Sequence, residues 1–201
     1  MLLALDDAFL PATLAGHPMS DDEFAAFCAE HPDLSFEMSA EGEIIVMPPT
    51  YTKTGVRNTR INRQLDVWAE ADGRGFASDS SSGFVLPNGA RRSPDAAWVA
   101  MSRVEALDLG SQEKYWHLGP DFVIELKSST DRMRKVKAKM REWMANGAQL
   151  AWLIDLETST VTIYRPDGTE EVRTGIDSIA GEGPVNGFIL NLTRIWDTKK
   201  A

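Results

Sequence analysis

The sequence predicts an α/β or α+β layered domain, because segments with the pattern of strands alternate with helical segments through the middle and late chain. Its 201 residues fit one domain, which we expect to span residues 1–201. With 43% hydrophobic and 25% charged residues, the composition is typical of a globular protein and excludes a disordered or fibrous chain. The longest apolar runs are far shorter than the ~18 residues that span a membrane, so we expect no membrane partner.

The net charge and the single cysteine exclude several kinds of function and binding site. The formal net charge of −9 argues against a protein that coats nucleic acid without specificity, but it leaves room for a localised basic site. The single cysteine, Cys28, excludes an intramolecular disulfide and a cysteine-based metal cage. The first residues contain no basic leader and soon include two acids, Asp6 and Asp7, so we expect a cytoplasmic protein.

The first part of the chain has the patterns of a short helix, a hairpin and a longer helix. Ser20 followed by Glu23 forms a capping box, which predicts a helix that ends near Cys28 or Ala29. Residues 36–47 have the pattern of a hairpin, closed by Pro48 and Pro49. A longer helix is predicted up to Gly73, because apolar residues recur near the helical period at Val56, Ile61, Leu65 and Trp68.

The rest of the chain alternates between strands and helices. Asn88-Gly89 lies between the apolar segments 84–86 and 91–99 and predicts a hairpin. A short helix at 102–107 leads to a strand at 121–127. A basic helix follows, capped by Thr130 or Asp131 and ended by Gly147, with an inner face of Met133, Val136, Met140 and Trp143. The last predicted strands are 148–155 and 161–164.

The strand at 121–127 carries the first candidate chemistry. Side chains alternate along a strand, so Phe122, Ile124 and Leu126 are expected to face the core. Glu125 and Lys127 then share the opposite face, ~6.5 to 7 Å apart at the backbone, where both could converge on one phosphate or one metal-bound water. The alternative is an exposed ion pair worth ~0 to 1 kcal/mol.

Asp95 favours the functional interpretation. It comes directly before the apolar stretch 96–99, at the start of a strand that could pair with the strand carrying Glu125. Two carboxylates would then face one cation, and Mg²⁺ is commonly held by one or two carboxylates with water and substrate phosphate. Such an ion polarises a phosphoryl oxygen, and a nearby ammonium offsets the charge that builds on the phosphate. These residues are a minimal set for phosphodiester hydrolysis.

At these residues the sequence resembles a known family. Pro94-Asp95, then Glu125-Leu126-Lys127, then a basic helix are similar to the PD-(D/E)xK nuclease signature. The wider chain resembles the Uma-two family of restriction-endonuclease-like proteins. The segments that carry the likeness are 36–50, 55–58, 83–90, 92–99, 120–131, 139–140 and 146–155.

The resemblance implies a restriction-endonuclease-like α/β fold, with a central mixed sheet flanked by helices and the active site where the sheet splays. It implies that Asp95 and Glu125 hold Mg²⁺ or Mn²⁺, and that Lys127 orients the water or stabilises the transition state. Many relatives carry another residue at the position of Lys127, so this sequence is closer than they are to the full nuclease pattern. Glu37, at the family's early acidic position, is a further candidate ligand or base, or else an ordinary hairpin residue.

The basic helix is the candidate nucleic-acid interface. Arg132, Lys135 and Lys139 are spaced by three and four residues, so they are expected to share one helical stripe that contacts phosphate. The alternative is a helix face that is merely solvated.

The sequence therefore predicts a metal-dependent endonuclease that acts on DNA, with RNA or a branched junction as other substrates. The main alternative is a non-catalytic nucleic-acid-binding or dimerisation module with the same fold, which the net charge of −9 favours. A homodimer is a candidate assembly under both hypotheses. A glycosidase with paired carboxylates leaves the basic helix unexplained. The scattered histidines match no metal-ligand spacing, and the phosphate-binding loop and the Gly-x-Ser-x-Gly elbow are both missing from the sequence.

Overall fold

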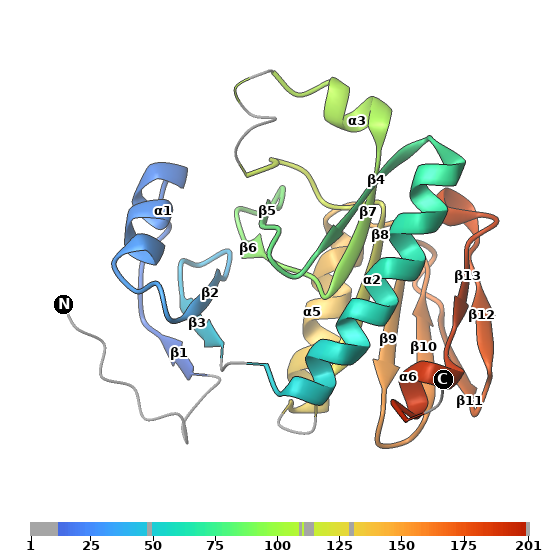
Figure 1. The fold of residues 1–201 in the computed structure, drawn as a ribbon. Coiled ribbons are helices and arrows are strands. Elements are labelled where there is room, and N and C mark those ends of the chain that lie inside the picture. Colours follow the sequence, from blue (N-terminus) through green and yellow to red (C-terminus); the bar gives the residue numbers. More distant parts are fainter. Residues whose placement is uncertain (1–11, 48–49, 109, 111–114, 129–130, 200–201) are drawn as a thin grey trace.

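The computed structural model describes residues 12–47, 50–108, 110, 115–128 and 131–199 (Figure 1). Its centre is a six-stranded sheet in the order β11 (Glu170–Thr174), β10 (Thr160–Tyr164), β9 (Leu150–Asp155), β8 (Phe122–Lys127), β7 (Ala96–Ala100) and β4 (Gly75–Asp79). Strands β8 and β9 are parallel and the other neighbours are antiparallel. The sheet is therefore mixed, as the resemblance to the Uma-two family implies.

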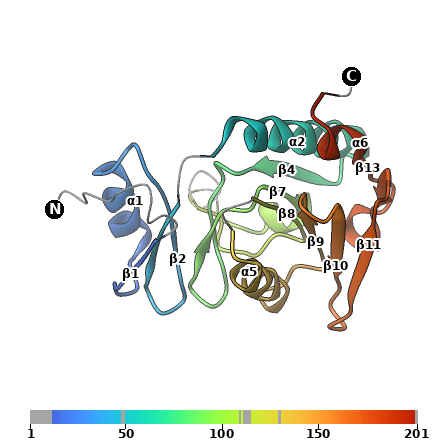
Figure 2. The same ribbon diagram turned by 90° about the horizontal axis from the view of Figure 1, so that it is seen from below.

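Two helices cover the two faces of this sheet. Figure 2 shows α2 (Thr52–Asp72) and α5 (Met133–Ala145) on opposite sides of the central strands. The even-numbered side chains of β8 pack in one core cluster with Ile61 and Leu65 of α2. Val123 packs in a second cluster with Met140 and Trp143 of α5. The expectation that Phe122, Ile124 and Leu126 face the core is confirmed, and the opposite face of the strand also meets a core, because each helix buries one face.

The last part of the chain extends the core on the α2 side. Strands β12 (Ser178–Ala180) and β13 (Ile189–Asn191) pair with each other, and η2 (Gly183–Val185) and α6 (Thr193–Trp196) flank them. Phe188 stacks on Trp152 with ring centroids 5.9 Å apart. Arg57 of α2 donates to the carbonyl of Ile195. None of these late elements is predicted by the sequence patterns.

A second, smaller sheet lies beside the central one (Figure 1). Its order is β1 (Ala12–Leu14), β3 (Ile44–Met47), β2 (Ser35–Met38), β6 (Arg91–Arg92) and β5 (Phe84–Val85), all antiparallel. The hairpin of β2 and β3 is confirmed, although Pro48 and Pro49 lie outside the described residues. The capping box of Ser20 and Glu23 is also present, at the start of α1 (Asp21–Ala29).

The segment 91–99 departs from the prediction of one strand. It divides into β6, which joins the smaller sheet, and β7, which joins the central sheet. Pro94 lies at the division, and proline has no N–H to continue a hydrogen-bonded ladder. Asp95 is thus placed where the chain passes from one sheet to the other. Strand β4 is also missed, because Gly75-Phe-Ala-Ser-Asp79 has no strong strand pattern.

The helices otherwise follow the sequence patterns closely. Gly73 is the C-cap of helix α2 and adopts the left-handed conformation. Helix α3 (Met101–Glu105) is the expected short helix. Helix α5 begins later than predicted, with Arg132 as its N-cap. The Asp131 carboxylate instead accepts from the Ser128 backbone N–H, and Thr130 lies outside the described residues. Within the described part of the chain, no helix combines the length and apolar character needed to cross a membrane.

A pair of glycine substitutions tests the packing of β4. A Cβ at Gly75 would lie 2.3 Å from the carbonyl oxygen of Val99 and 2.4 Å from the Trp98 ring, whereas a Cβ at Gly55 of α2 meets no atom within 4 Å. Gly75→Ala should lower the free energy of unfolding by ~1 to 3 kcal/mol through overpacking. Gly55→Ala should raise it by up to ~1 kcal/mol through helix propensity. Denaturant titrations of both variants measure this difference, and equal effects would contradict the packing of β4.

Candidate active site

The expected site residues gather at one end of the central sheet, where β8 and β9 finish and β7 begins. In the antiparallel pairing of β7 with β8, Ala96 lies opposite Ile124. Asp95 and Glu125 are the next residues beyond that pair on their two strands. The predicted pairing of these two segments is confirmed, and it brings the two acids to the same end of the sheet.

Asp95 is held by α2 and by the backbone of β8. Its Oδ1 accepts a hydrogen bond from the Asn58 amide and its Oδ2 accepts one from the Leu126 backbone N–H, both at 2.7 Å. The Asn62 amide also donates to the Asp95 carbonyl at 2.9 Å. Burial raises the pKa of Asp95, and the Leu126 N–H, the charge of Lys139 and the Asn58 amide offset only part of that rise.

Glu125 is bound from the side of α5. Its Oε1 accepts from the Trp143 indole N–H and from the Lys139 ammonium, each at 2.9 Å. Burial raises the pKa of Glu125 to about 7, with Lys139 opposing the rise and the charges of Asp95 and Glu37 adding to it. The charge of Asp95 therefore contributes to the raised pKa of Glu125, whereas Asp131 is the acid that contributes to the raised pKa of Asp95.

Glu37 enters the site from the smaller sheet. Its Oε1 accepts from the Lys139 ammonium at 2.8 Å and from the Ser93 backbone N–H at 3.1 Å. Its Oε2 lies 3.1 Å from Nη1 of Arg92. Burial alone would raise the pKa of Glu37, but the charges of Lys139 and Arg92 lower it overall. Glu37 is thus a buried residue of the β2–β3 hairpin that belongs to the cluster, and its part as a ligand or base stays a prediction.

Lys139 lies inside this acidic cluster and not on an exposed stripe. Besides its contacts with Glu37 and Glu125, it donates to the Ser93 carbonyl at 3.0 Å. Burial works against its charge, yet the two carboxylates raise the pKa of Lys139 overall. It follows Val136 by three residues and precedes Trp143 by four, so it shares their inward face. Arg132 and Lys135 are exposed, and the expected common stripe is wrong for Lys139.

Lys127 has other partners. Its ammonium lies 2.5 Å from Oε2 of Glu157 and 3.7 Å from Oδ1 of Asp155. Asp155 ends β9 in register with Lys127, and Glu157 follows two residues later. The hydrogen bond from Lys127 to Glu157, more than any other effect, raises the pKa of Lys127. The structure therefore places Lys127 on the β9 side of the site, and its part in a reaction stays a prediction.

Four further residues of the cluster are not identified from the sequence. Arg92 donates through Nε to Glu142 at 2.6 Å, Trp143 donates to Glu125, and Asn58 holds Asp95. Helical spacing could have indicated two of them. Asn58 precedes Ile61, on the inner face of α2, by three residues, and Glu142 follows Lys139 on α5 by three residues. Each side chain therefore lies about one turn from a residue of the core or of the cluster.

The cluster carries an excess of negative charge on oxygen donors, which is the donor type that a hard divalent cation prefers. Among its described members, the acids Glu37, Asp95, Glu125 and Glu142 outnumber the cations Arg92 and Lys139, and Asp131 adds negative charge near Asp95. Within the described residues no group of three or more His, Cys, Asp and Glu side chains is arranged to hold a metal ion. A cation here would thus rest on the pair Asp95 and Glu125, completed by water, as Mg²⁺ allows.

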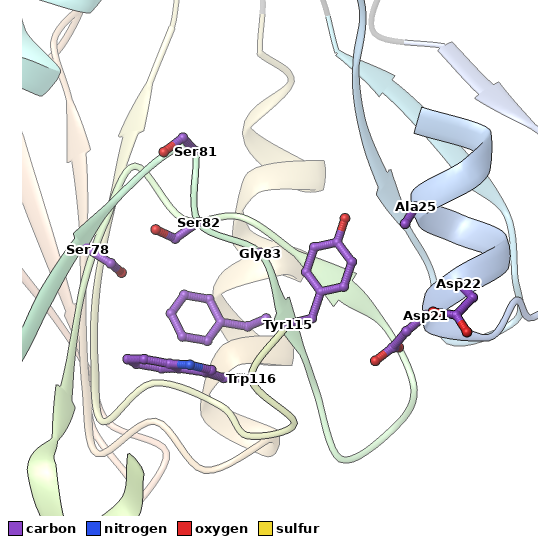
Figure 3. A pocket seen from close by; sticks show the side chains of 10 residues that line it. Asp21, Asp22, Ala25, Ser78, Ser81, Ser82, Gly83, Tyr115 and Trp116 are labelled. Atoms are coloured by element: carbon purple, nitrogen blue, oxygen red, sulfur yellow. The ribbon is translucent and has the colours of Figure 1, made fainter. Parts of the chain in front are cut away.

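A pocket of about 500 Å³ lies elsewhere, between α1 and the connection from β4 to β5 (Figure 3). Its lining includes Asp21, the hydroxyls of Ser78 and Ser82, and the rings of Tyr115 and Trp116. None of the predicted site residues is among its described lining residues. The acidic cluster is therefore separate from this pocket.

The raised pKa of Glu125 predicts a pH dependence of stability in the metal-free protein. Because the folded-state pKa, about 7, exceeds the ordinary value of 4.5, protonation of Glu125 favours the folded state. This stabilisation is complete below pH ~4.5 and is lost as the pH rises through ~7. Glu125→Gln should remove this pH-dependent loss of stability. The denaturation midpoints measured in EDTA at pH 5 and pH 8 should therefore differ more in the wild type than in the variant. A Glu125 carboxyl signal in NMR that titrates near 4.5 would contradict the environment described.

Comparisons with known proteins agree with the fold described above. The profile of the Uma2 family, described as "Putative restriction endonuclease", matches residues 21–193. A solved structure from Anabaena variabilis, described as a "putative nuclease belonging to DUF820", is similar with a TM-score of 0.71 and 21% identity. The match covers 89% of this chain and 98% of that chain, which confirms the expected fold. No curated protein sequence matches. Since the family profile spans most of its length, the chain belongs to the Uma2 family of restriction-endonuclease-like proteins.

Proposed function

We propose that this protein is a metal-dependent endonuclease that hydrolyses phosphodiester bonds in nucleic acid, with DNA as the first substrate to test. The observation that carries the proposal is the placement of Asp95 and Glu125. The pairing of β7 with β8 brings them to one end of the sheet. Glu125 is buried and Asp95 partly buried, and desolvation raises the pKa of both. Perturbed acids that converge at the end of a sheet are typical of catalytic sites.

In this proposal Asp95 and Glu125 hold Mg²⁺ or Mn²⁺. A bound cation of this kind polarises a phosphoryl oxygen and lowers the pKa of the attacking water. The chain itself supplies the orientation of the ligands. The Asn58 amide and the Leu126 N–H hold both oxygens of Asp95, and the Trp143 N–H holds Oε1 of Glu125. These hydrogen bonds already restrict the side-chain conformations of the two acids. Less conformational entropy would therefore be lost when a cation binds.

Substitution of the two acids tests the proposal. Asp95→Asn and Glu125→Gln should each reduce Mg²⁺- or Mn²⁺-dependent cleavage by about 100-fold or more and weaken Mn²⁺ binding, because each removes a charged ligand. Glu170→Gln is the matched control, since Glu170 lies outside the cluster and pairs with Arg141. Cleavage is measured on supercoiled, single-stranded and branched DNA and on RNA, with EDTA as a blank, and Mn²⁺ binding is measured by calorimetry. Unchanged Mn²⁺ binding in both variants would refute the metal site.

A second candidate function is a non-catalytic nucleic-acid-binding module. The observation that favours it is Lys139, whose ammonium already balances Glu37 and Glu125 without a metal. Such a module would bind nucleic acid equally well in EDTA and would cleave no substrate with either metal. The same assays thus separate the two candidates.

The first turn of α5 offers an approach for phosphate. Arg132 and Lys135 are exposed, and the ion pairs among the described residues include neither of them. Arg141, on the same helix, is instead paired with Glu170 at 2.9 Å. We propose that Arg132 and Lys135 contact the phosphates of the bound nucleic acid.

Salt dependence tests this contact. Replacing both Arg132 and Lys135 with Ala should flatten the dependence of log K on log salt by about two units, since each phosphate neutralised on duplex DNA contributes a slope of roughly −0.9. Arg141→Ala is the control and should leave the slope nearly unchanged, because Glu170 already pairs with that charge. Binding is followed by fluorescence anisotropy between ~50 and 200 mM salt. If the double variant keeps the wild-type slope, phosphate docks on another surface.

A further inference from the structure

The first half of α2 and the segment around α6 together carry a basic surface. The net charge of the chain is −9, yet residues 52–64 contain four bases and no acid, and residues 191–199 contain two bases and one acid, Asp197. The six bases, which we call the α2–α6 basic surface, are Lys53, Arg57, Arg60, Arg63, Arg194 and Lys199. The sequence patterns do not indicate this surface, because its two parts are brought together only by the fold.

Hydrogen bonds join the two segments. Arg57 donates through Nε to the Ile195 carbonyl at 2.9 Å, and Arg60 donates to the carbonyls of Arg194 and Thr198 at 2.5 and 3.1 Å. A carbonyl group has no net charge, so both guanidinium groups keep their positive charge. Within the described residues, none of the six bases forms an ion pair. The surface therefore presents positive charge that no salt bridge neutralises.

This surface lies beside the candidate active site. Asn58, in the same half of α2, donates to the Asp95 carboxylate at 2.7 Å, and Asn62 donates to the Asp95 carbonyl at 2.9 Å. Figure 1 shows the start of α2, the start of α5 and the short helix α6 at the end of the central sheet where β8 and β9 finish. In Figure 2, α6 lies next to α2, whereas α5 lies on the opposite side of the sheet. The α2–α6 basic surface thus adjoins the acids on the side away from α5.

We infer that the α2–α6 basic surface binds the sugar–phosphate backbone of nucleic acid next to the site. This inference rests on the proposed function. An acidic protein with an acidic cluster repels a polyanion, so positive charge beside the cluster is needed to concentrate the substrate there. From Lys53 to Arg63 the helix rises about 15 Å. Duplex DNA carries one charge per ~1.7 Å of its axis, so the surface is long enough to meet several phosphates. Contacts of this kind position the substrate without selecting its base sequence.

A triple variant with Lys53→Gln, Arg63→Gln and Arg194→Gln tests the inference. Among the described residues these exposed side chains have no hydrogen-bond or ionic partner, so their replacement should leave the fold intact. Binding of duplex and single-stranded DNA of equal length is followed by fluorescence anisotropy in EDTA, where metal-dependent cleavage is prevented. The variant should bind about tenfold or more weakly, and the slope of log K against log salt should flatten by about two to three units.

A second triple variant is the control for net charge. It replaces three exposed arginines that are already paired with Asp72, Glu170 and Glu171, namely Arg74→Gln, Arg141→Gln and Arg173→Gln. Both triple variants lose three positive charges, so a difference between them reports where the charges lie. The control should keep the wild-type slope to within about half a unit. Equal slopes in the two variants would overturn the inference.

The outcomes separate this inference from the proposed function. If the wild type binds DNA but cleaves no substrate with Mg²⁺ or Mn²⁺, and only the first triple variant loses affinity, the function fails and the surface stands. If the wild type cleaves while the first triple variant keeps its affinity and slope, the surface fails and the function stands. A wild type that binds phosphatidylserine-containing phosphatidylcholine vesicles through these bases, but neither form of DNA, would overturn the inference in favour of a membrane partner.

Circular dichroism checks that the first triple variant is folded. Should it be unfolded, Lys53→Gln and Arg63→Gln are tested as single variants, and each should flatten the slope by about one unit. Wild-type slopes in both single variants would overturn the inference.

Discussion

The ammonium group of Lys139 joins the parts of this protein that form the acidic cluster. It binds Glu37 of the smaller sheet, Glu125 of the central sheet and the Ser93 carbonyl of the segment that passes between the two sheets. Removing one partner of a buried charge pair costs several kcal/mol, because the other charge is left uncompensated. The relative placement of β2, β8 and α5 at the site therefore depends on this one cation.

The same cluster keeps an excess of negative charge in a largely buried place. Lys139 and Arg92 hold the pKa of Glu37 low, but they do not prevent the rise in the pKa of Glu125. The difference follows from the contacts, since Glu37 faces two cations and Glu125 faces one cation and two acids. An environment that separates the pKa values of neighbouring acids is what acid and base chemistry at neutral pH requires. A divalent cation would relieve the same repulsion.

Much of the site follows from local patterns, and the missing parts have a common physical cause. The strand of residues 122–127 and the placement of Asp95 before Ala96 are readable from side-chain alternation, and their pairing was predicted from the apolar run after Asp95. Arg92 and Asn58 were not assigned as site residues, because the spacing of a polar side chain indicates its face of a helix or strand but not its partner. Their partners Glu37 and Asp95 lie 55 and 37 residues away. Pro94 could have indicated the break between β6 and β7, but not that the two strands enter different sheets.

By itself the sequence determined the layered α/β or α+β class, the elements that carry the acids and the placement of Asp95 and Glu125 at one end of the sheet, because strand and helix periods and turn residues are local properties. The mixed sheet was implied by the resemblance to the Uma-two family. It did not determine which acids each lysine contacts. Lys127 and Lys139 both follow Glu125 closely, and a lysine side chain reaches whichever acids its neighbours present. The packing of α5 on β8 turns Lys139 toward Glu37 and Glu125, and the parallel pairing of β8 with β9 places Asp155 beside Lys127. Only the tertiary structure decides those contacts, since they join segments that are distant in the sequence.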